Sequence, residues 1–213
     1  MRYAVKEIYY TLQGEGANAG RAAVFLRFAG CNLWTGRQED RSLGPSCSAW
    51  CDTDFLGTDG PGGGRFETAA QLAAAVKSLW PAGAQSKRFV VCTGGEPLLQ
   101  LDDALIAELH AARFEIAVET NGTLAAPSSI DWLTVSPKAN CDLMLTMGDE
   151  LKLIFPQPGA EPQRFEGLDF HHFFLQPMDG PDGVRNTRLT LEYCLAFPQW
   201  RLSLQTHKIL QIR

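Results

Sequence analysis

The chain has 213 residues, 45% hydrophobic and 20% charged, a composition typical of a globular protein with one domain. Its net charge of −5 gives no electrostatic basis for binding nucleic acid. The first residues do not form a signal peptide, and no apolar run is long enough to span a membrane. We therefore expect a single domain over residues 1–213, located in the cytoplasm, with neither a nucleic-acid nor a membrane partner.

Short apolar runs alternate along the chain with helical segments. We expect strands, in order, at Val5–Tyr9, Ala22–Phe28, Arg88–Cys92, Glu115–Thr120, Trp132–Val135, Glu150–Phe155, His172–Leu175 and Trp200–Gln205. We expect helices at Ala69–Trp80, Asp103–Ala112 and Thr187–Ala196, the first two capped by Thr68 and Asp102. The glycine-rich segment Gly57–Gly64 is predicted to be a flexible surface excursion. Unbroken apolar strands indicate a parallel sheet covered on both faces. The pattern predicts an α/β fold, an incomplete TIM-like barrel of mostly parallel strands, because the units are too few for a full barrel.

A polar loop after the Ala22–Phe28 strand contains three cysteines, Cys31, Cys47 and Cys51, with no histidine among them. Structural zinc requires four ligands, and this stretch offers no fourth. An iron–sulfur cluster held by three thiolates would instead leave one iron open to a small molecule. The loop therefore favours a cluster, with zinc as the competing metal. The other cysteines, at 92, 141 and 194, are predicted to be core residues.

Polar motifs follow several of the predicted strands, where sites of parallel α/β folds lie. They are Thr93–Pro97, Glu119–Gly122, Ser136–Lys138 and Gln176–Asp179. In the first motif, two glycines let a ligand approach the backbone, and the Glu96 carboxylate could pair with an ammonium group. Alone, this motif would be interpreted as an ordinary strand-to-helix turn. Beside a three-cysteine loop, it favours a ligand site.

A Gly-Gly-Glu-Pro turn after a three-cysteine loop resembles the radical S-adenosylmethionine (SAM) enzymes. The resemblance becomes more specific when further motifs are read in order, and it covers nearly the whole chain from about Val5. The ordered set is similar to the 7-carboxy-7-deazaguanine synthase family, although any one motif is weak. The motifs are Tyr10–Gly16, Cys51–Asp54, Cys92–Pro97, Glu119–Gly122, Ser136–Lys138, Gln176–Asp179 and Gln205–Lys208.

This resemblance implies a radical ring contraction of 6-carboxy-5,6,7,8-tetrahydropterin to 7-carboxy-7-deazaguanine with release of ammonia, in queuosine (7-deazapurine) biosynthesis. It implies that Cys31, Cys47 and Cys51 hold a 4Fe–4S cluster, that SAM occupies the fourth iron, and that Thr53 binds Mg²⁺. It also implies a homodimer and an electron donor such as flavodoxin. The residues implied for SAM are Trp50, Gly95, Glu96, Ser136, Pro137, Lys138, Gln176, Pro177, Met178 and Asp179. Those implied for the pterin are Leu12, Gln13, Gly14, Arg27, Thr93, His207 and Arg213.

Two positions depart from the family pattern. Three residues separate Cys47 from Cys51 where two are usual, and the chain ends in Arg213 rather than proline. The spacing leaves open a second interpretation, a non-catalytic metal-binding or regulatory protein on the same fold. A radical SAM activase acting on a protein partner is a third, which the pterin-facing motifs disfavour. Arg27 lies in an apolar strand, so a structural ion pair is as consistent with the sequence as substrate binding.

Overall fold

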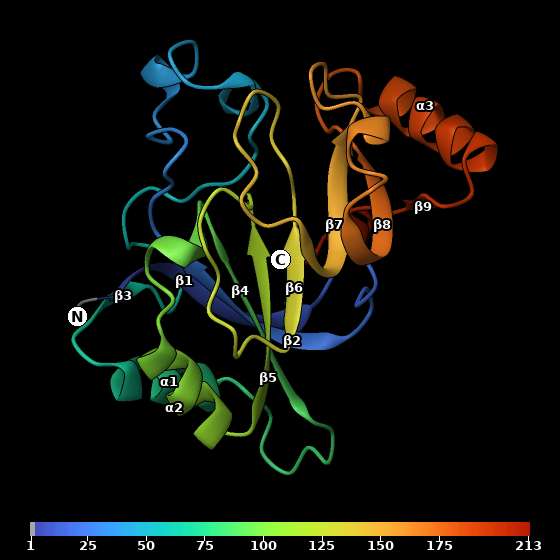
Figure 1. The fold of residues 1–213 in the computed structure, drawn as a ribbon. Coiled ribbons are helices and arrows are strands. Elements are labelled where there is room, and N and C mark those ends of the chain that lie inside the picture. Colours follow the sequence, from blue (N-terminus) through green and yellow to red (C-terminus); the bar gives the residue numbers. More distant parts are fainter. Residues whose placement is uncertain (1–2) are drawn as a thin grey trace.

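The structure is a computed structural model that describes residues 3–213 (Figure 1). Its strands are β1 (Tyr3–Leu12), β2 (Ala22–Phe28), β3 (Gly64–Phe66), β4 (Arg88–Gly94), β5 (Phe114–Thr120), β6 (Trp132–Val135), β7 (Met147–Phe155), β8 (Asp169–Pro177) and β9 (Arg201–Leu202). They form one sheet in the order β3-β1-β2-β4-β5-β6-β7-β8-β9. β1 pairs antiparallel with β2 and β3, and every pair from β2 to β9 is parallel. The sheet is therefore mostly parallel, as predicted, and it does not close, because β3 and β9 are its edges.

The helices are α1 (Ala69–Ser78), α2 (Asp103–Ala111), α3 (Gly183–Ala196) and the short α4 (Thr206–Leu210). α1 and α2 lie side by side, whereas α3 packs against β8 at the other end of the sheet (Figure 1). The two predicted caps are confirmed: Thr68 Oγ1 accepts from Gln71 N at 3.2 Å and Asp102 Oδ1 from Leu105 N at 2.9 Å. None of the helices within residues 3–213 is long and apolar enough to cross a membrane.

The central strands form the core because their apolar runs are covered on both faces of the sheet. Val24, Leu26, Val90 and Ile116 are all fully buried, in one cluster that also includes residues of α1 and α2. Burying one such side chain stabilises the fold by about 1.5–3 kcal/mol. Cys92 belongs to this core, as predicted. The same prediction is wrong for Cys141 and Cys194, which are only partly buried. Cys194 packs against the smaller cluster around β7 and β8.

The glycine-rich segment Gly57–Gly64 runs along β1. Gly60 N donates to Lys6 O at 2.9 Å, and Ile8 N donates to Pro61 O at 2.8 Å. A Cβ at Gly63 would lie 2.2 Å from Lys6 O, closer than any real side chain could. Close approach to β1 therefore accounts for Gly60, Gly62 and Gly63, and the segment leads directly into β3.

The end of the chain connects opposite parts of the sheet. Thr206 N, at the start of α4, donates to Gly14 O at 3.0 Å, in the loop that joins β1 to β2. In the same loop, Gly16 N donates to Ser203 Oγ, which follows β9, at 3.0 Å. Residues near β1 and residues near β9 are thus held together, and between them they border the space at the carboxyl ends of the parallel strands.

Candidate active site

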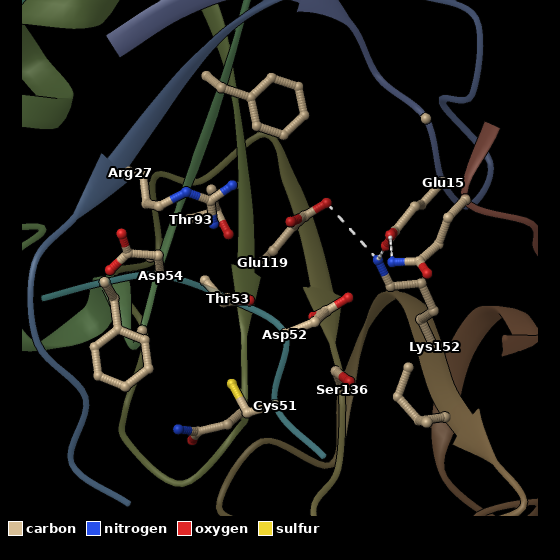
Figure 2. A pocket seen from close by; sticks show the side chains of 18 of the residues that line it. Glu15, Arg27, Cys51, Asp52, Thr53, Asp54, Thr93, Glu119, Ser136 and Lys152 are labelled. Atoms are coloured by element: carbon tan, nitrogen blue, oxygen red, sulfur yellow. Dashed lines mark hydrogen bonds and ion pairs between the residues drawn. The ribbon is translucent and has the colours of Figure 1, made fainter. Parts of the chain in front are cut away.

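A cavity of about 540 Å³ lies at the carboxyl ends of the parallel strands, the expected position for a site in this kind of sheet. Its lining comes from β1, β2 and β4 to β8, from the cysteine loop and from the C-terminal segment. Figure 2 shows side chains from these distant segments pointing into one space. The predicted site residues that line it are Leu12, Gln13, Gly14, Arg27, Cys31, Cys47, Trp50, Cys51, Thr53, Thr93, Gly95, Ser136, Lys138, Gln176, Pro177, Asp179, His207 and Arg213.

The cysteine loop brings its three thiols to this one cavity. Cys31 follows β2, and Cys47 lies in a short 3₁₀ turn, Ser46–Ala49. Cys51 N donates to Cys47 O at 2.9 Å, so the three intervening residues complete one helical turn. Residues four apart on such a turn share a face, and the unusual spacing therefore keeps both sulfurs on the cavity side.

All three thiols are free, and the surroundings of Cys31 and Cys47 favour protonated sulfur in the chain by itself. Burial raises the pKa of Cys47 to about 11, although the nearby Lys138 ammonium opposes the rise. Burial also raises the pKa of Cys31. A bound metal centre favours the thiolate form and displaces these protons. Within residues 3–213, no three His, Cys, Asp or Glu side chains meet closely enough to hold a single metal ion. The three thiols line a space large enough for a bigger inorganic group.

Thr53 offers a hydroxyl to the cavity between two aspartates that are already paired with lysines. Lys208 Nζ lies 2.6 Å from Asp52 Oδ2, and Lys6 Nζ lies 2.8 Å from Asp54 Oδ2. These ion pairs fix the chain on either side of Thr53. Hydroxyl and carboxylate oxygens are the ligands that Mg²⁺ prefers, so the donor chemistry here fits that ion.

The wall across from Cys51 carries a buried charged network (Figure 2). The Lys152 ammonium contacts the Glu15 carboxylate and lies 3.8 Å from Glu119 Oε1. Gln13 Nε2 donates to the same Glu119 oxygen at 3.0 Å. Burial alone would raise the pKa of Glu15, but the Lys152 cation lowers it to about 2. Burial would likewise lower the pKa of Lys152, but the neighbouring carboxylates raise it above its usual range. Both groups are therefore charged at neutral pH.

Comparison with known proteins identifies the family. No protein-family model matches the chain. A protein of Caulobacter vibrioides named 7-carboxy-7-deazaguanine synthase is 62% identical over 210 residues, covering 99% of both chains. A Bradyrhizobium diazoefficiens protein of the same name is 61% identical over 100% of both chains. The chain belongs to the 7-carboxy-7-deazaguanine synthase family. The crystal structure of QueE from Escherichia coli is similar too, with a TM-score of 0.68 and 28% identity over 96% of this chain and 94% of that chain.

Membership of the synthase family makes the chain an enzyme. Three of the predicted site residues do not line the cavity: Glu96, Pro137 and Met178. Glu96 is fully buried, and its carboxylate accepts hydrogen bonds from Leu98 N, Thr120 Oγ1 and Asn121 N at 2.7–3.0 Å. These three donors fix the carboxylate between the turn after β4 and the end of β5. Met178 borders a neighbouring pocket of about 400 Å³ that Trp50 also lines. Pro137 lies next to the cavity-lining Ser136 and Lys138, and its carbonyl accepts from Gln157 at 3.3 Å.

Several charged residues of this family member's cavity are absent from the sequence-based site, among them the network of Glu15, Glu119 and Lys152. Glu15 and Glu119 stand within motifs that the sequence singled out, but no role was assigned to them. Lys152 lies inside the predicted strand Glu150–Phe155, and a lysine within an apolar run was the available signal. Such a residue is almost never buried without a partner.

Gly95, in the turn after β4, lies close to the start of the cysteine loop. A Cβ there would lie 2.3 Å from Gly30 O and 2.8 Å from the Cβ of Cys31, so backbone would have to move. We expect Gly95→Ala to destabilise the fold by about 1–3 kcal/mol and to lower the iron and sulfide content after reconstitution. Thermal unfolding and chemical iron and sulfide assays measure both effects. Gly167→Ala is the matched control, because nothing lies within 4 Å of its Cβ position. Full cluster content in the Gly95 variant would show that the approach is not required.

Proposed function

We propose that the chain catalyses the radical ring contraction of 6-carboxy-5,6,7,8-tetrahydropterin to 7-carboxy-7-deazaguanine with release of ammonia. It would act as a carbon–nitrogen lyase of the radical SAM superfamily, in queuosine (7-deazapurine) biosynthesis. One observation carries the proposal: three free thiols and a wall of carboxylate, amide and guanidinium groups share a single cavity. A relative of 62% identity with the synthase name supports the same chemistry.

In this proposal the cofactors bind on the cysteine side of the cavity. Cys31, Cys47 and Cys51 hold the 4Fe–4S cluster, and Thr53 provides an oxygen ligand for Mg²⁺. When bound, the cluster and SAM supply the one-electron bond cleavage that begins the reaction. Lys138 donates to Ser136 O at 2.7 Å and to Ser136 Oγ at 2.6 Å, which keeps this loop folded on the cavity wall. The residues assigned to SAM are Trp50, Gly95, Glu96, Ser136, Pro137, Lys138, Gln176, Pro177, Met178 and Asp179.

The pterin is assigned to the charged and polar side of the cavity. Glu119 presents its side-chain oxygens to the cavity, and they can accept hydrogen bonds from the N–H edge of a pterin ring. Gln13 and Lys152 hold that carboxylate in place. Arg27 supplies a planar donor for the substrate carboxylate. The residues assigned to the pterin are Leu12, Gln13, Gly14, Arg27, Thr93, His207 and Arg213. Positioning of this kind is what the protein contributes.

The proposal extends to the architecture and the cell biology of the chain. The open sheet is interpreted as an incomplete barrel of the radical SAM type, formed by one domain over residues 1–213. A low-potential protein such as flavodoxin is the proposed electron donor, and a homodimer the proposed assembly. The cytosol is the proposed compartment, since a reducing environment suits a thiolate-bound cluster.

The alternative of a non-catalytic metal-binding or regulatory protein rested on the spacing between Cys47 and Cys51. The helical turn closed by Cys51 N and Cys47 O accommodates the added residue without turning either sulfur from the cavity. Because the chain is a member of an enzyme family, the catalytic interpretation is the one we retain.

The deciding experiment is SAM cleavage by anaerobically reconstituted protein with and without the pterin. We expect 5′-deoxyadenosine to form faster when 6-carboxytetrahydropterin is present, together with ammonia and 7-carboxy-7-deazaguanine. Removing Mg²⁺ with a chelator should slow turnover, and adding it back should restore the rate. Liquid chromatography with mass spectrometry identifies both products. A loaded cluster without any ring-contracted product would contradict the proposal.

A further inference from the structure

The last residue of the chain takes part in a three-residue ion cluster on the cavity wall. Glu7 of β1 lies between two arginines: its Oε1 accepts from Arg27 Nε at 2.9 Å and its Oε2 from Arg213 Nη1 at 3.0 Å. All three side chains line the cavity. One side-chain carboxylate thus faces two guanidinium groups, and these three side chains together carry one positive unit of charge.

The position of Arg213 is fixed by more than this ion pair. Thr11 Oγ1 donates to the main-chain oxygen of Arg213 at 2.7 Å, and the Arg213 guanidinium lies 5.5 Å from the centre of the Tyr9 ring. Tyr9 also accepts a hydrogen bond from Arg27 Nη2 at 3.3 Å and stacks on Phe25. The Tyr9 side chain and the Thr11 hydroxyl, both of β1, therefore hold the two arginines beside one glutamate.

The two arginine side chains differ in exposure, and we assign them different roles for this reason. The side chains of Glu7 and Arg27 are 16% and 18% exposed, whereas that of Arg213 is 55% exposed. Without Arg213, the Glu7 carboxylate would pair with the Arg27 guanidinium alone and would neutralise its charge. Arg213 pairs with the second oxygen of Glu7, so the positive charge of Arg27 is only partly neutralised. The remaining N–H donors of Arg27 can then bind another anion. A carboxylate paired with two cations attracts a second carboxylate that a neutral pair would not.

We propose that Arg213 is a positioning and specificity residue, which acts through Glu7 to leave Arg27 free to bind the carboxylate of the substrate. The inference rests on the proposed function, because it concerns the carboxylate of the proposed pterin. Arg213 should therefore matter for a pterin with a carboxylate and not for one without.

Two fluorescent probes test this directly, 6-carboxypterin and unsubstituted pterin, titrated into anaerobically reconstituted protein with SAM and Mg²⁺. We expect Arg213→Met to weaken 6-carboxypterin binding about tenfold, while pterin binding changes by less than about twofold. Arg213→Lys should restore much of the loss, because the charge returns. Arg65→Met, which removes an exposed guanidinium from β3, is the matched control and should change neither affinity.

A double-mutant cycle with Glu7→Gln separates this role from simple packing. If Arg213 acts by offsetting the Glu7 charge, its removal in the Glu7→Gln background should cost less than about twofold. Equal losses for both probes, or the same tenfold loss in both backgrounds, would overturn the inference. If the parent protein carries out ring contraction and Arg213→Met binds both probes as the parent does, the inference is wrong but the proposed function stands. A parent protein that binds neither probe would overturn the proposed function as well.

Discussion

Serine in place of Cys31, Cys47 or Cys51 should abolish SAM cleavage and leave a protein without sulfide-bridged iron. Each of the three thiols lines the same cavity, and each is proposed to hold one iron. A serine hydroxyl is close in size to a thiol but is neither ionised near neutral pH nor a soft ligand, so it does not replace a thiolate. Loss of one ligand from three is expected to reduce cleavage to the level of the protein before reconstitution.

Two other cysteines serve as controls for the loss of a thiol. Cys92 is fully buried in the core of β4, where burial raises its pKa to about 12, and Cys194 lies on α3. Cys92→Ala and Cys194→Ser should keep full iron and sulfide content and most of the cleavage rate. Iron and sulfide assays, with the visible absorption of the cluster, measure the outcome. Equal loss in all five variants would contradict the ligand assignment, and bound zinc without sulfide would favour the non-catalytic alternative.

Strands formed by short apolar runs could be predicted from the sequence alone. Ala22–Phe28 and Trp132–Val135 match β2 and β6 residue for residue, since an apolar run bounded by polar residues leaves little freedom at either end. β1 is longer at both ends than the predicted Val5–Tyr9. Its outer residues pair with β2 and β3, and pairing of this kind depends on distant strands rather than on local composition.

Short elements held by distant partners could not be predicted. β3 has three residues and α4 five, too few for any periodic pattern, and no strand or helix was expected at either position. α4 is held instead through Thr206, which bonds to Gly14, and Lys208, which bridges Asp52 and Asp179. The final predicted strand, Trp200–Gln205, shrinks to Arg201–Leu202 because the following residues turn toward the cavity.

The cavity could be predicted as far as its motifs, because strand-end polar residues converge whenever strands are parallel. Its ion pairs could not. Lys152 and Glu15 lie 137 positions apart, and Arg213 and Glu7 lie 206 apart. Sequence indicates that a lysine in a buried strand needs a counter-ion, but not which carboxylate supplies it. The structure supplies this counter-ion for Lys152.

Replacing Lys152 by methionine should destabilise the fold by about 3–5 kcal/mol at neutral pH, because it leaves buried carboxylates without their cation. The lysine side chain is 7% exposed and that of Glu15 14%. Glu119 lies within ion-pair distance, and Glu150, whose pKa burial already raises, lies nearby as well. Because Glu119 and Gln13 belong to the same network, the pterin should also bind more weakly.

The pH dependence of this loss has a definite sign. In the parent, the pKa of Glu15 is lowered from 4.5 to about 2, so its stabilising contribution is complete above pH 4.5 and is lost toward pH 2. The raised pKa of Lys152 makes its contribution complete below 10.5 and lost above that value. The parent pair is therefore intact from about pH 4.5 to 10.5. In the variant, protonation of the unpaired carboxyl groups relieves the buried charge, so the deficit should shrink as the pH falls from about 7.5 to 5.

Urea unfolding followed by circular dichroism, at about pH 7.5 and 5, measures both the deficit and its change. Lys77→Met is the matched control: this lysine is exposed at the end of α1, and its loss should change stability by less than about 0.5 kcal/mol at either pH. Adding Glu15→Gln to the Lys152 variant should recover part of the stability at the higher pH, because one buried charge is removed. A deficit that is equal at the two pH values, or that the second substitution deepens, would show that Lys152 contributes by packing rather than by charge.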